Sequence, residues 1–452
     1  MAAWAALLPR PARLPPYLES RAERIQRQER VLLMLGGLFL ILNILTLTGV
    51  RGEIRLLEIA IPPVWAACMA LAHFTLSRLR PIHDPILLPL AGTFAGWGVI
   101  LMDRLAPALL GQQLTWLVVA TLGLVSVVLL PPDLRWLRRF RYTWLTLGLA
   151  LLAATLLLGV NPLGDGPRLW LNLGGIYFQP SEFLKLLLVV YLASYLHEKR
   201  EMLLEQTDDE GQKTEDKRRL ASILRLPSSA PYLAPLLVMW GLCVILLIWQ
   251  RDLGAASLFF IVFLGMLYLA SGQARYLIAG LVLLLLGGLL GYALFDVVRL
   301  RVDAWLNPWP ETRTRAFQIV QSLYAVAAGG VLGRGLGLGA PTLVPVAHSD
   351  FVFAALTEEF GLAGAFAVIA GFAVLVVRAA RAAILAHTAF RTLLAGGIAL
   401  VFGAQALIIM GGNIRLIPLT GVTLPFLSYG GSSLLVSFIM IGLLIQVSSD
   451  AA

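Results

Sequence analysis

Residues 346–361, VAHSDFVFAALTEEFG, place three carboxylates at the start of a long apolar run. Asp350 stands just before the run, where two interpretations are open. A carboxylate can take the proton of a hydroxyl nucleophile, so Asp350 is a candidate general base. A carboxylate at this place can also cap the following helix by accepting a hydrogen bond from a first-turn amide. The residue type alone does not separate catalysis from capping.

Glu358 and Glu359 lie inside the apolar run, and capping does not account for them. Glu358 would stand about 12 Å further along a helix axis than Asp350. A carboxylate at that depth in a membrane is costly unless it is paired or faces a wet cavity. Both glutamates can form a salt bridge or hydrogen bond between helices, an interpretation that suits Glu359 best. Glu358 remains a candidate cavity residue.

A second chemical pair occurs in QPSEFLK at 179–185, where Glu182 and Lys185 are three residues apart and share a helix face. Lys185 is the only lysine outside the polar segment 198–230. A buried ion pair that fixes helix packing would explain both residues. The alternative is that they line a polar cavity and contact a charged substrate.

Arginines near predicted helix ends form a third group. Arg168 stands in GDGPRLW, Arg251 precedes Asp252 in QRDLG, and RLRVDAW supplies Arg299 and Arg301. Arginine side chains can hold a phosphate or pyrophosphate through paired N–H donors. Their aliphatic stems also let them snorkel from a helix end to the membrane interface, and this plainer interpretation stays open.

The elements that must position these residues follow from composition. Of the 452 residues, 59% are hydrophobic and 13% are charged, a balance that predicts an all-α polytopic membrane protein. Windows of about 20 apolar residues, enough to cross a bilayer core, recur along the chain. The predicted spans, about twelve in number, lie at 31–49, 56–76, 85–103, 113–131, 142–161, 178–197, 232–249, 253–271, 276–297, 352–377, 389–411 and 430–447.

An even number of spans puts both termini on one side of the membrane. Arginines in the short connecting segments cluster on the side of the arginine-rich N-terminus, and the positive-inside rule makes that side cytoplasmic. The polar segment 198–230 lies on the same side and is expected to be a solvated, charged loop. Segment 298–351 lies on the extracytoplasmic side and is predicted to be a long loop with tight turns at its glycines.

Several other classes of protein lose support. The net charge of +9 comes from the segments between spans, so it does not indicate a nucleic-acid-binding surface. The sequence has no P-loop and no dinucleotide fingerprint, and its histidines and cysteines form no metal-ligand cluster. Cys68 and Cys243 fall within predicted spans and indicate nothing about a redox compartment.

Five motifs occur in an order and spacing that resemble the SEDS proteins, the RodA and FtsW group. They are GDGPRLW…QPSEFLK, QRDLG, FQIVQSLYAVAAGGVLGRG, PVAHSDFVFAALTEEFG and GNIRLIPLTGVTLPFLSYGGSS. The resemblance covers about residues 84–447 and implies a transmembrane core of ten helices. Residues 31–83 then form a two-helix N-terminal addition, and residues 1–30 form a cytoplasmic basic arm able to lie on anionic lipid.

The resemblance implies a peptidoglycan glycosyltransferase of the bacterial cytoplasmic (inner) membrane. Such an enzyme polymerises lipid II, a disaccharide-pentapeptide on undecaprenyl pyrophosphate, on the extracytoplasmic face. The essential aspartate of the family maps to Asp350, which would be the catalytic general base. Further positions implied to bind substrate or line the cavity are Glu182, Lys185, Arg168, Asp252, Arg301, Gln321, His348, Ser349 and Glu358.

Three motifs depart from the family pattern. Ser349 replaces the usual threonine and keeps a hydroxyl. GPRLW replaces a segment with two adjacent arginines, so only Arg168 carries over. In QRDLG, Arg251 replaces a proline, which alters the expected turn but retains Asp252.

A transporter that flips a lipid-linked precursor is the competing interpretation, because intramembrane Glu and Lys residues also suit transport. A scaffold whose activity resides in a partner is a third. The resemblance implies a class B penicillin-binding transpeptidase as partner, besides the surrounding membrane lipids. It fixes no cofactor, although Mg²⁺ or Mn²⁺ can serve a pyrophosphate leaving group. The motifs do not separate elongation, division and sporulation roles.

Overall fold

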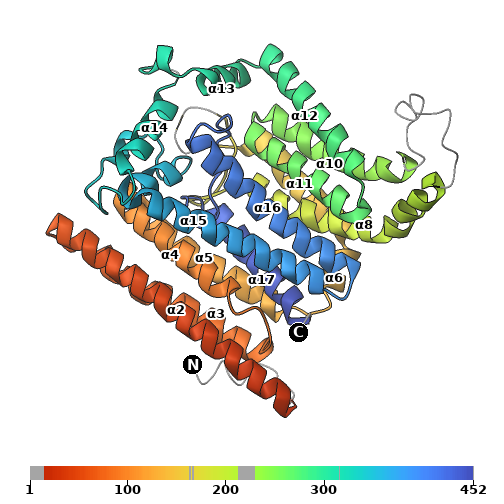
Figure 1. Ribbon diagram of the computed structural model, residues 1–452, viewed down its shortest axis with the longest axis horizontal. Helices are drawn as coiled ribbons and strands as arrows, with labels where there is room; N and C mark the ends of the chain where they lie inside the picture. The colour runs from red at the N-terminus through yellow and green to blue at the C-terminus, as the bar shows by residue number, and fades with distance from the viewer. Residues whose placement is uncertain (1–14, 162–163, 165–166, 212–229, 315, 451–452) are drawn as a thin grey trace. The chain divides into compact units, whose positions relative to one another are not determined.

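The computed structural model describes residues 15–161, 164, 167–211, 230–314 and 316–450. The described residues are mainly helical and form two compact units, each assembled from segments far apart in the chain (Figure 1). Unit 1 comprises Met1–Leu134, Asp303–His387 and Gln405–Ala452, and unit 2 comprises Arg135–Val302 and Thr388–Ala404.

Unit 1 is a bundle of long helices with three short 3₁₀ turns. Its elements are α2 (Pro16–Arg51), α3 (Leu56–Leu79), α4 (Leu87–Leu105), η1 (Pro107–Leu109), α5 (Leu110–Leu129), η2 (Trp309–Glu311), α14 (Phe317–Gly329), η3 (Pro341–Leu343), α15 (Val352–Leu385) and α17 (Gly431–Asp450). Helix α5 packs along α17, and α14 packs along α15. The N-terminal helix α2 lies along both α3 and α4, as Figure 1 shows.

Unit 2 contains further helices and the one strand pair among the described residues. Its elements are α6 (Arg135–Arg139), α7 (Arg141–Leu158), β1 (Leu171–Leu173), β2 (Ile176–Phe178), α8 (Pro180–Gly211), α10 (Ala230–Trp249), α11 (Leu253–Ser271) and α12 (Ala274–Leu294). Helix α8 packs against α7, α10 and α11. Helices α13 (Asp296–Leu306) and α16 (Ala389–Asn413) cross the boundary between the units in sequence.

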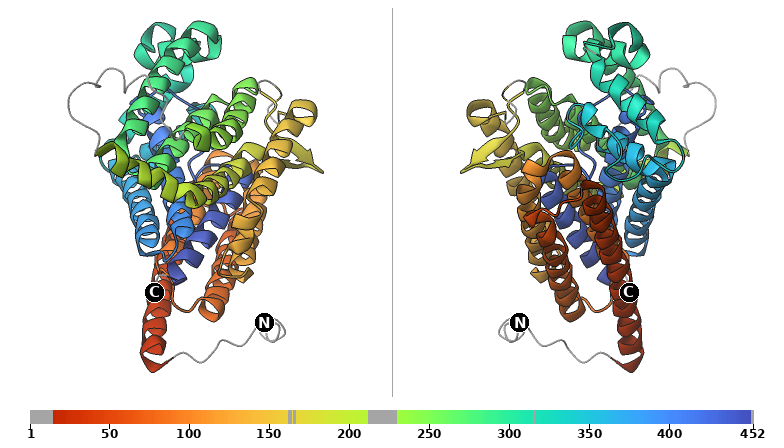
Figure 2. Two further views of the ribbon diagram at one scale, coloured as in Figure 1. Left: turned by 90° about the vertical axis from the view of Figure 1, so that its right-hand side faces the viewer. Right: turned by 90° about the vertical axis from the view of Figure 1, so that its left-hand side faces the viewer.

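The strand pair is an antiparallel hairpin that leads into α8, and Figure 2 shows it near α7. Leu173 pairs with Ile176, so the turn between them has two residues. These are Gly174 and Gly175, with φ of 65° and 92°. Such a turn needs positive φ at both positions, which glycine adopts without a steric penalty. The glycine pair therefore makes a tight hairpin immediately before the helix of Glu182.

Nine helices among the described residues are long and apolar enough to cross a membrane. They are Pro16–Arg51, Leu56–Leu79, Pro107–Leu129, Arg141–Leu158, Leu253–Ser271, Ala274–Leu294, Val352–Leu385, Ala389–Asn413 and Gly431–Ser449. The other three predicted spans coincide with α4, α8 and α10. The apolar part of α10, Ala234–Trp249, is shorter, and α4 and α8 carry charged residues. Helices thus occur at all twelve predicted positions, while the number that cross the membrane stays a prediction.

Three segments predicted to lie outside the spans contain helix. Residues 16–30 of the expected basic arm belong to α2, because they are rich in Arg, Glu and Gln, which favour helix, and lack glycine. Segment 298–351 includes most of α13, all of α14 and two 3₁₀ turns rather than a continuous loop. Helix α8 extends to Gly211 into the predicted polar loop, and residues 212–229 of that loop lie outside the described residues.

Helix α15 is interrupted at Gly361, where φ is 66° and ψ is −165°. The interruption frees the carbonyls of Glu358 and Glu359, which accept hydrogen bonds from the N–H groups of Arg334 and Gly335 at 2.9 and 3.0 Å. On the other side, the freed N–H groups of residues 362 and 363 donate to the carbonyls of residues 330 and 331 at 3.0 and 3.2 Å. An unpaired backbone group is costly in a membrane. The loop 330–340 supplies hydrogen-bond partners for the backbone groups that the break in α15 leaves unpaired.

The N-terminal helices are fastened to unit 1 by buried polar contacts as well as by packing. Glu29 of α2 is fully buried, and its carboxylate contacts His73 of α3 at 2.7 Å and also His83, which precedes α4. A buried carboxylate requires such partners to offset its desolvation. At the other end of α2, Arg51 joins Glu58 of α3 to α4.

Replacing Gly329 with Ala should destabilise unit 1. An added Cβ would lie 2.0 Å from the carbonyl oxygen of Thr357 and 3.0 Å from the Cα of Glu358. Both are backbone atoms of α15 and cannot rotate away, so α14 must shift, at a cost of about 1–3 kcal/mol. We expect a lower midpoint of thermal unfolding in detergent. Gly49→Ala is the control, since no atom lies within 4 Å of its added Cβ. Equal midpoints for the two variants would contradict the packing argument.

Candidate active site

The backbone of the segment that carries Asp350 is held at three consecutive carbonyls. The carbonyl of His348 accepts a hydrogen bond from the N–H of Tyr429 at 2.8 Å. The next carbonyl, that of Ser349, accepts one from the hydroxyl of Ser428 at 2.6 Å. The carbonyl of Asp350 accepts one from the side-chain amide of Asn413 at 2.8 Å. Groups from the end of α16 and the segment before α17 thereby fix the position of the aspartate.

Asn413 also performs the capping for which Asp350 was a candidate. Its side-chain oxygen accepts a hydrogen bond from the first-turn N–H of Ala354 at 3.1 Å. Helix α15 begins after Phe351, and the N-cap residue Phe351 provides no side-chain cap. Asn413 is fully buried, and its own carbonyl accepts a hydrogen bond from Ser322 of α14 at 2.8 Å. One asparagine therefore links α14, α15 and α16.

The side chains next to Asp350 are polar and partly buried. The hydroxyl of Ser349 donates to a carboxylate oxygen of Asp350 at 2.5 Å, so the serine that replaces threonine retains a hydrogen bond to the candidate base. The ring of His348 lies edge-on to Tyr429, with centroids 5.9 Å apart. Burial lowers the pKa of His348, and the charge of Asp350 opposes this only in part. Burial therefore favours the neutral imidazole of His348.

Both turns that meet at this site contain a strained residue. Val346 has φ of 54° and Phe426 has φ of 67°. Left-handed backbone is unfavourable for a β-branched or bulky side chain. Such strain persists only where the surroundings enforce it, and it concentrates at functional sites. The hydrogen bonds from Ser428 and Tyr429 supply that enforcement here.

Glu358 and Glu359 hold structure in place rather than standing alone. A carboxylate oxygen of Glu358 accepts a hydrogen bond from the N–H of Ala340 at 2.8 Å. The carboxylate of Glu359 accepts one from Nε of Arg104 in α4 at 2.7 Å. The interhelical salt bridge expected for Glu359 is therefore present, and Glu358 anchors the loop that precedes the candidate base. Gln321 lies half-buried on α14, next to Ser322.

Unit 2 brings together another group of candidate residues at the start of α8 and of α11. Nζ of Lys185 donates to the carboxylate of Glu182 at 2.6 Å, and both side chains are largely buried. Ser181 donates to a carboxylate oxygen of Asp252 at 3.3 Å, so α8 and α11 share this polar cluster. The predicted helix-face pairing of Glu182 with Lys185 is confirmed.

Asp252 caps α11 by accepting a hydrogen bond from the N–H of Ala255 at 3.1 Å. Burial raises its pKa, and the charge of Glu182 raises it further, whereas Ala255, Ser181 and Arg301 act in the opposite direction. The preceding residue, Arg251, has φ of 61°. Proline is restricted to φ near −65°, so the turn here differs from the one that proline would form.

Arg168 and Arg301 have different surroundings. The charge of Arg301 in α13 acts on Asp252, which associates it with the cluster of unit 2. Arg168 is exposed and lies two residues before Trp170, whose backbone pairs with that of Val160. Within the described part of the chain, no group of three or more His, Cys, Asp or Glu side chains could hold a metal ion.

We did not predict Asn413, Ser428 or Tyr429 as site residues from the sequence. All three lie in the motif GNIRLIPLTGVTLPFLSYGGSS, and Asn413 ends a predominantly apolar helix. A polar amide at the end of an apolar helix was the available signal, since buried polar groups require hydrogen-bond partners. The identity of those partners is a property of the fold.

This chain is similar to known proteins in both sequence and fold. Residues 101–452 match the FTSW_RODA_SPOVE family, described as "Cell cycle protein". The chain is 36% identical over 392 residues to the peptidoglycan glycosyltransferase RodA of Mycobacterium tuberculosis, covering 84% of this chain and 81% of that one. It is 36% identical over 338 residues to the probable peptidoglycan glycosyltransferase FtsW of Geobacter sulfurreducens, covering 74% of this chain and 84% of the other.

Solved structures show the same likeness. One solved structure matches with a TM-score of 0.65 and 28% identity, covering 82% of this chain and 98% of that chain. It is described as "Structural coordination of polymerization and crosslinking by a peptidoglycan synthase complex". The crystal structure of the Thermus thermophilus rod shape determining protein RodA matches with a TM-score of 0.57 and 24% identity, over 81% of this chain and 97% of its own, and so shares the fold. The chain belongs to the FTSW_RODA_SPOVE family of cell cycle proteins.

Proposed function

We propose that this protein is a peptidoglycan glycosyltransferase that polymerises lipid II on the extracytoplasmic face of the bacterial inner membrane, with Asp350 as general base. The names of relatives that are 34–36% identical over most of the chain support the activity. The observation that carries the role of Asp350 is the fixation of three consecutive carbonyls at residues 348–350. It holds the backbone of the aspartate, and the hydroxyl of Ser349 donates a hydrogen bond to the carboxylate.

The proposed reaction is a single displacement. A carboxylate oxygen of Asp350 takes the proton from the 4-hydroxyl of the acceptor GlcNAc, because a neutral sugar hydroxyl is a weak nucleophile. The acceptor oxygen forms a bond to the anomeric carbon of the donor MurNAc, and the bond from that carbon to the lipid pyrophosphate breaks. One base and one displacement imply inversion at the anomeric carbon, unlike the two-step retaining mechanism. The polyprenyl tails remain among the lipids around the apolar helices.

The leaving pyrophosphate requires positive charge, which we assign to Arg168 and other outer arginines such as Arg301, or to a divalent cation, while Glu182 and Lys185 shape the cavity. Glu182 and Asp252 then set the charge around Lys185 and Arg301. The described residues do not fit a preformed protein cage for a metal ion. Mg²⁺ commonly binds through one or two carboxylates together with substrate phosphates, so a requirement for Mg²⁺ or Mn²⁺ stays a prediction for the assay below.

The arrangement in the cell also forms part of the proposal. Both termini are cytoplasmic, as the arginine distribution predicts. The solved relative comes from a peptidoglycan synthase complex in which polymerization and crosslinking are coordinated. We therefore propose a class B penicillin-binding transpeptidase as partner of this chain. Polymerisation should be measured with and without that partner.

Replacing Asp350 with Asn should remove most polymerase activity while the protein still folds. Loss of a general base lowers a rate by about 10²- to 10⁴-fold, and asparagine accepts no proton in the relevant range. The measurement is formation of glycan chains from labelled lipid II by the reconstituted protein, with and without Mg²⁺ or Mn²⁺.

Asp296→Asn is the matched control, because the carboxylate of Asp296 is fully exposed outside the site. Full activity of Asp350→Asn would refute the role of Asp350. Exchange of lipid II between leaflets without glycan formation by the wild-type protein would favour a transporter instead.

Replacing His348 with Gln should change the acid side of the pH profile. Since the pKa of His348 is lowered, its protonation requires pH below the ordinary value of about 6.5. The resulting imidazolium would stabilise the ionised Asp350 and weaken it as a base. The activity of the wild type should thus fall more steeply in acid than that of His348→Gln, with similar rates near pH 7.5. The exposed His387 provides a control variant, His387→Gln. An equal loss of activity at acid pH in the wild type and in His348→Gln would contradict this prediction.

Variants of the Glu182–Lys185 pair separate substrate contact from packing. Lys185→Met leaves Glu182 buried and unpaired, so it should lower stability as well as activity. The double variant Glu182→Gln/Lys185→Met removes both charges and should regain stability. If Lys185 contacts the substrate, the polymerisation rate of both variants stays about 10²-fold low. Recovery of activity in the double variant would assign the pair to packing alone.

A further inference from the structure

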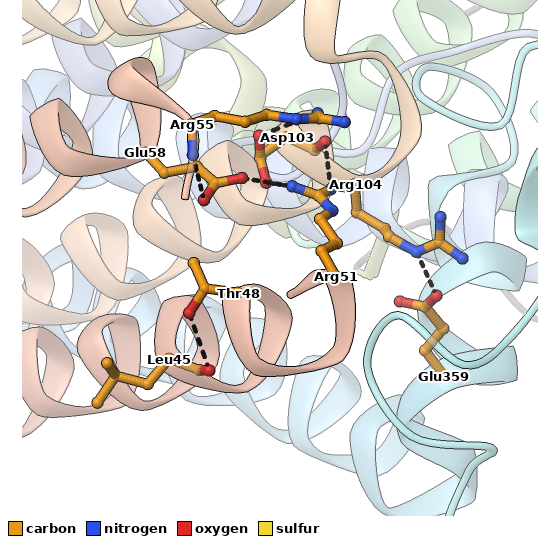
Figure 3. A network of polar contacts seen from close by, with 8 residues as sticks. All are labelled: Leu45, Thr48, Arg51, Arg55, Glu58, Asp103, Arg104 and Glu359. Carbon is orange, nitrogen blue, oxygen red and sulfur yellow. Dashed lines mark hydrogen bonds and ion pairs between the residues drawn. The ribbon is translucent and has the colours of Figure 1, made fainter. Parts of the chain in front are cut away.

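The helix pair α2–α3 precedes residue 101, where the family match begins. Its junction contacts the family core through Arg51, the last residue of α2 (Figure 3). The guanidinium of Arg51 lies 2.5 Å from Glu58 of α3 and 2.7 Å from a carboxylate oxygen of Asp103 in α4. It also donates to the backbone carbonyl of Asp103 at 2.9 Å. Arg51 thus holds both the side chain and the backbone of Asp103.

The neighbour of Asp103 on α4 is Arg104, which points to the loop before the candidate base. Nε of Arg104 donates to Glu359 at 2.7 Å, and another guanidinium nitrogen donates to the carbonyl of Gly339 at 2.8 Å. The side chain of Arg104 is 17% exposed and that of Glu359 is 1% exposed, so water screens the pair little. Figure 3 shows Arg51 directed to Asp103 and Arg104 directed to Glu359.

The loop 330–340 is attached to α15 through Glu358 and Glu359. Its N–H groups at residues 334 and 335 donate to the carbonyls of these glutamates, and the N–H groups at 337 and 340 bind their carboxylates. Helix α2 also contacts this loop directly, because a Cβ added at Gly337 would lie 3.2 Å from side-chain atoms of both Leu47 and Val50. The N-terminal helices therefore reach this loop by two routes.

We infer that the N-terminal helix pair is a brace for the loop that leads to Asp350, with Arg51 and Arg104 as its positioning residues. Arg51 fixes the end of α4, and Arg104 on α4 fixes the loop through Glu359 and Gly339. The loop continues through η3 into the segment 344–350, whose last three carbonyls are held as described above. The catalytic consequence rests on the proposed function, whereas the mechanical link does not.

Loss of the brace should have an effect that general destabilisation of unit 1 does not have. Weakening it should loosen the loop 333–343 and misplace Asp350, so kcat should fall while KM for lipid II changes little. The test variant is Arg51→Ala in the full chain, reconstituted in lipid nanodiscs. Arg51→Ala leaves Glu58 and Asp103 buried with Arg55 as the remaining arginine beside them, 3.9 Å from Asp103. A second variant, Arg51→Met/Glu58→Gln/Asp103→Asn, therefore removes all three charges together.

Hydrogen–deuterium exchange of the peptide covering 333–343 is the direct measurement, since its amides at 334, 335, 337 and 340 bind α15. We expect exchange there to rise about five- to thirtyfold in both variants, with a matching fall in kcat. The control is Arg378→Ala, which breaks the pair of Arg378 with Asp84 in the same unit. That pair, 2.6 Å apart and similarly buried, does not touch the loop.

Unchanged exchange of the loop in both Arg51 variants would overturn the brace. An equal rise in Arg378→Ala would also overturn it, because the effect would then reflect general loosening of unit 1. Increased exchange with unchanged kcat would refute the positioning role. If the wild-type protein forms no glycan from lipid II, the proposed function fails, and the exchange data alone still decide whether the N-terminal helices hold the loop.

Discussion

The structure around the candidate base depends on the break in α15, where backbone hydrogen bonds to the loop 330–340 replace those that the helix loses. A membrane-spanning helix cannot be interrupted at Gly361 without leaving carbonyl and N–H groups that lipid cannot satisfy. The loop 330–340 satisfies them on both sides of the break, with four backbone hydrogen bonds between residues 330–335 and 358–363. Because the loop is needed by the helix, its course is fixed, and so is the start of the segment that ends at Asp350.

Buried polar side chains in unit 1 stabilise this backbone arrangement through hydrogen bonds to backbone groups. Asn413 and Ser428 bind carbonyls next to the base, and Glu358 binds an amide of the loop. Each is a buried polar group whose cost in a membrane is offset by hydrogen bonds. These groups position the backbone at Asp350, and the hydroxyl of Ser349 donates a hydrogen bond to its carboxylate. The N-terminal helices are also attached through backbone carbonyls. Arg51 donates to the carbonyl of Asp103, and Arg104, the next residue, donates to the carbonyl of Gly339 in the loop.

The polar cluster of unit 2 is built differently. Its charges are close together on the first two turns of α8 and at the cap of α11, with Lys185 pairing with Glu182 and Asp252 bound by Ser181. The raised pKa of Asp252 shows that burial outweighs its hydrogen bonds. The left-handed conformation of Arg251 permits the turn that proline would prevent, so the aspartate keeps its capping role despite the altered motif.

The sequence by itself determined the helical segments and the candidate carboxylates, because a bilayer imposes apolar length and makes every buried charge conspicuous. It also predicted the Glu182–Lys185 pair, which is local in sequence. Only the tertiary structure decided which partners the carboxylates have. Asn413, 63 residues away in sequence, caps the helix in place of Asp350, and Arg104, 255 residues away, claims Glu359. Such partners are chosen by packing, which brings distant segments together, and no periodicity within one helix records that choice.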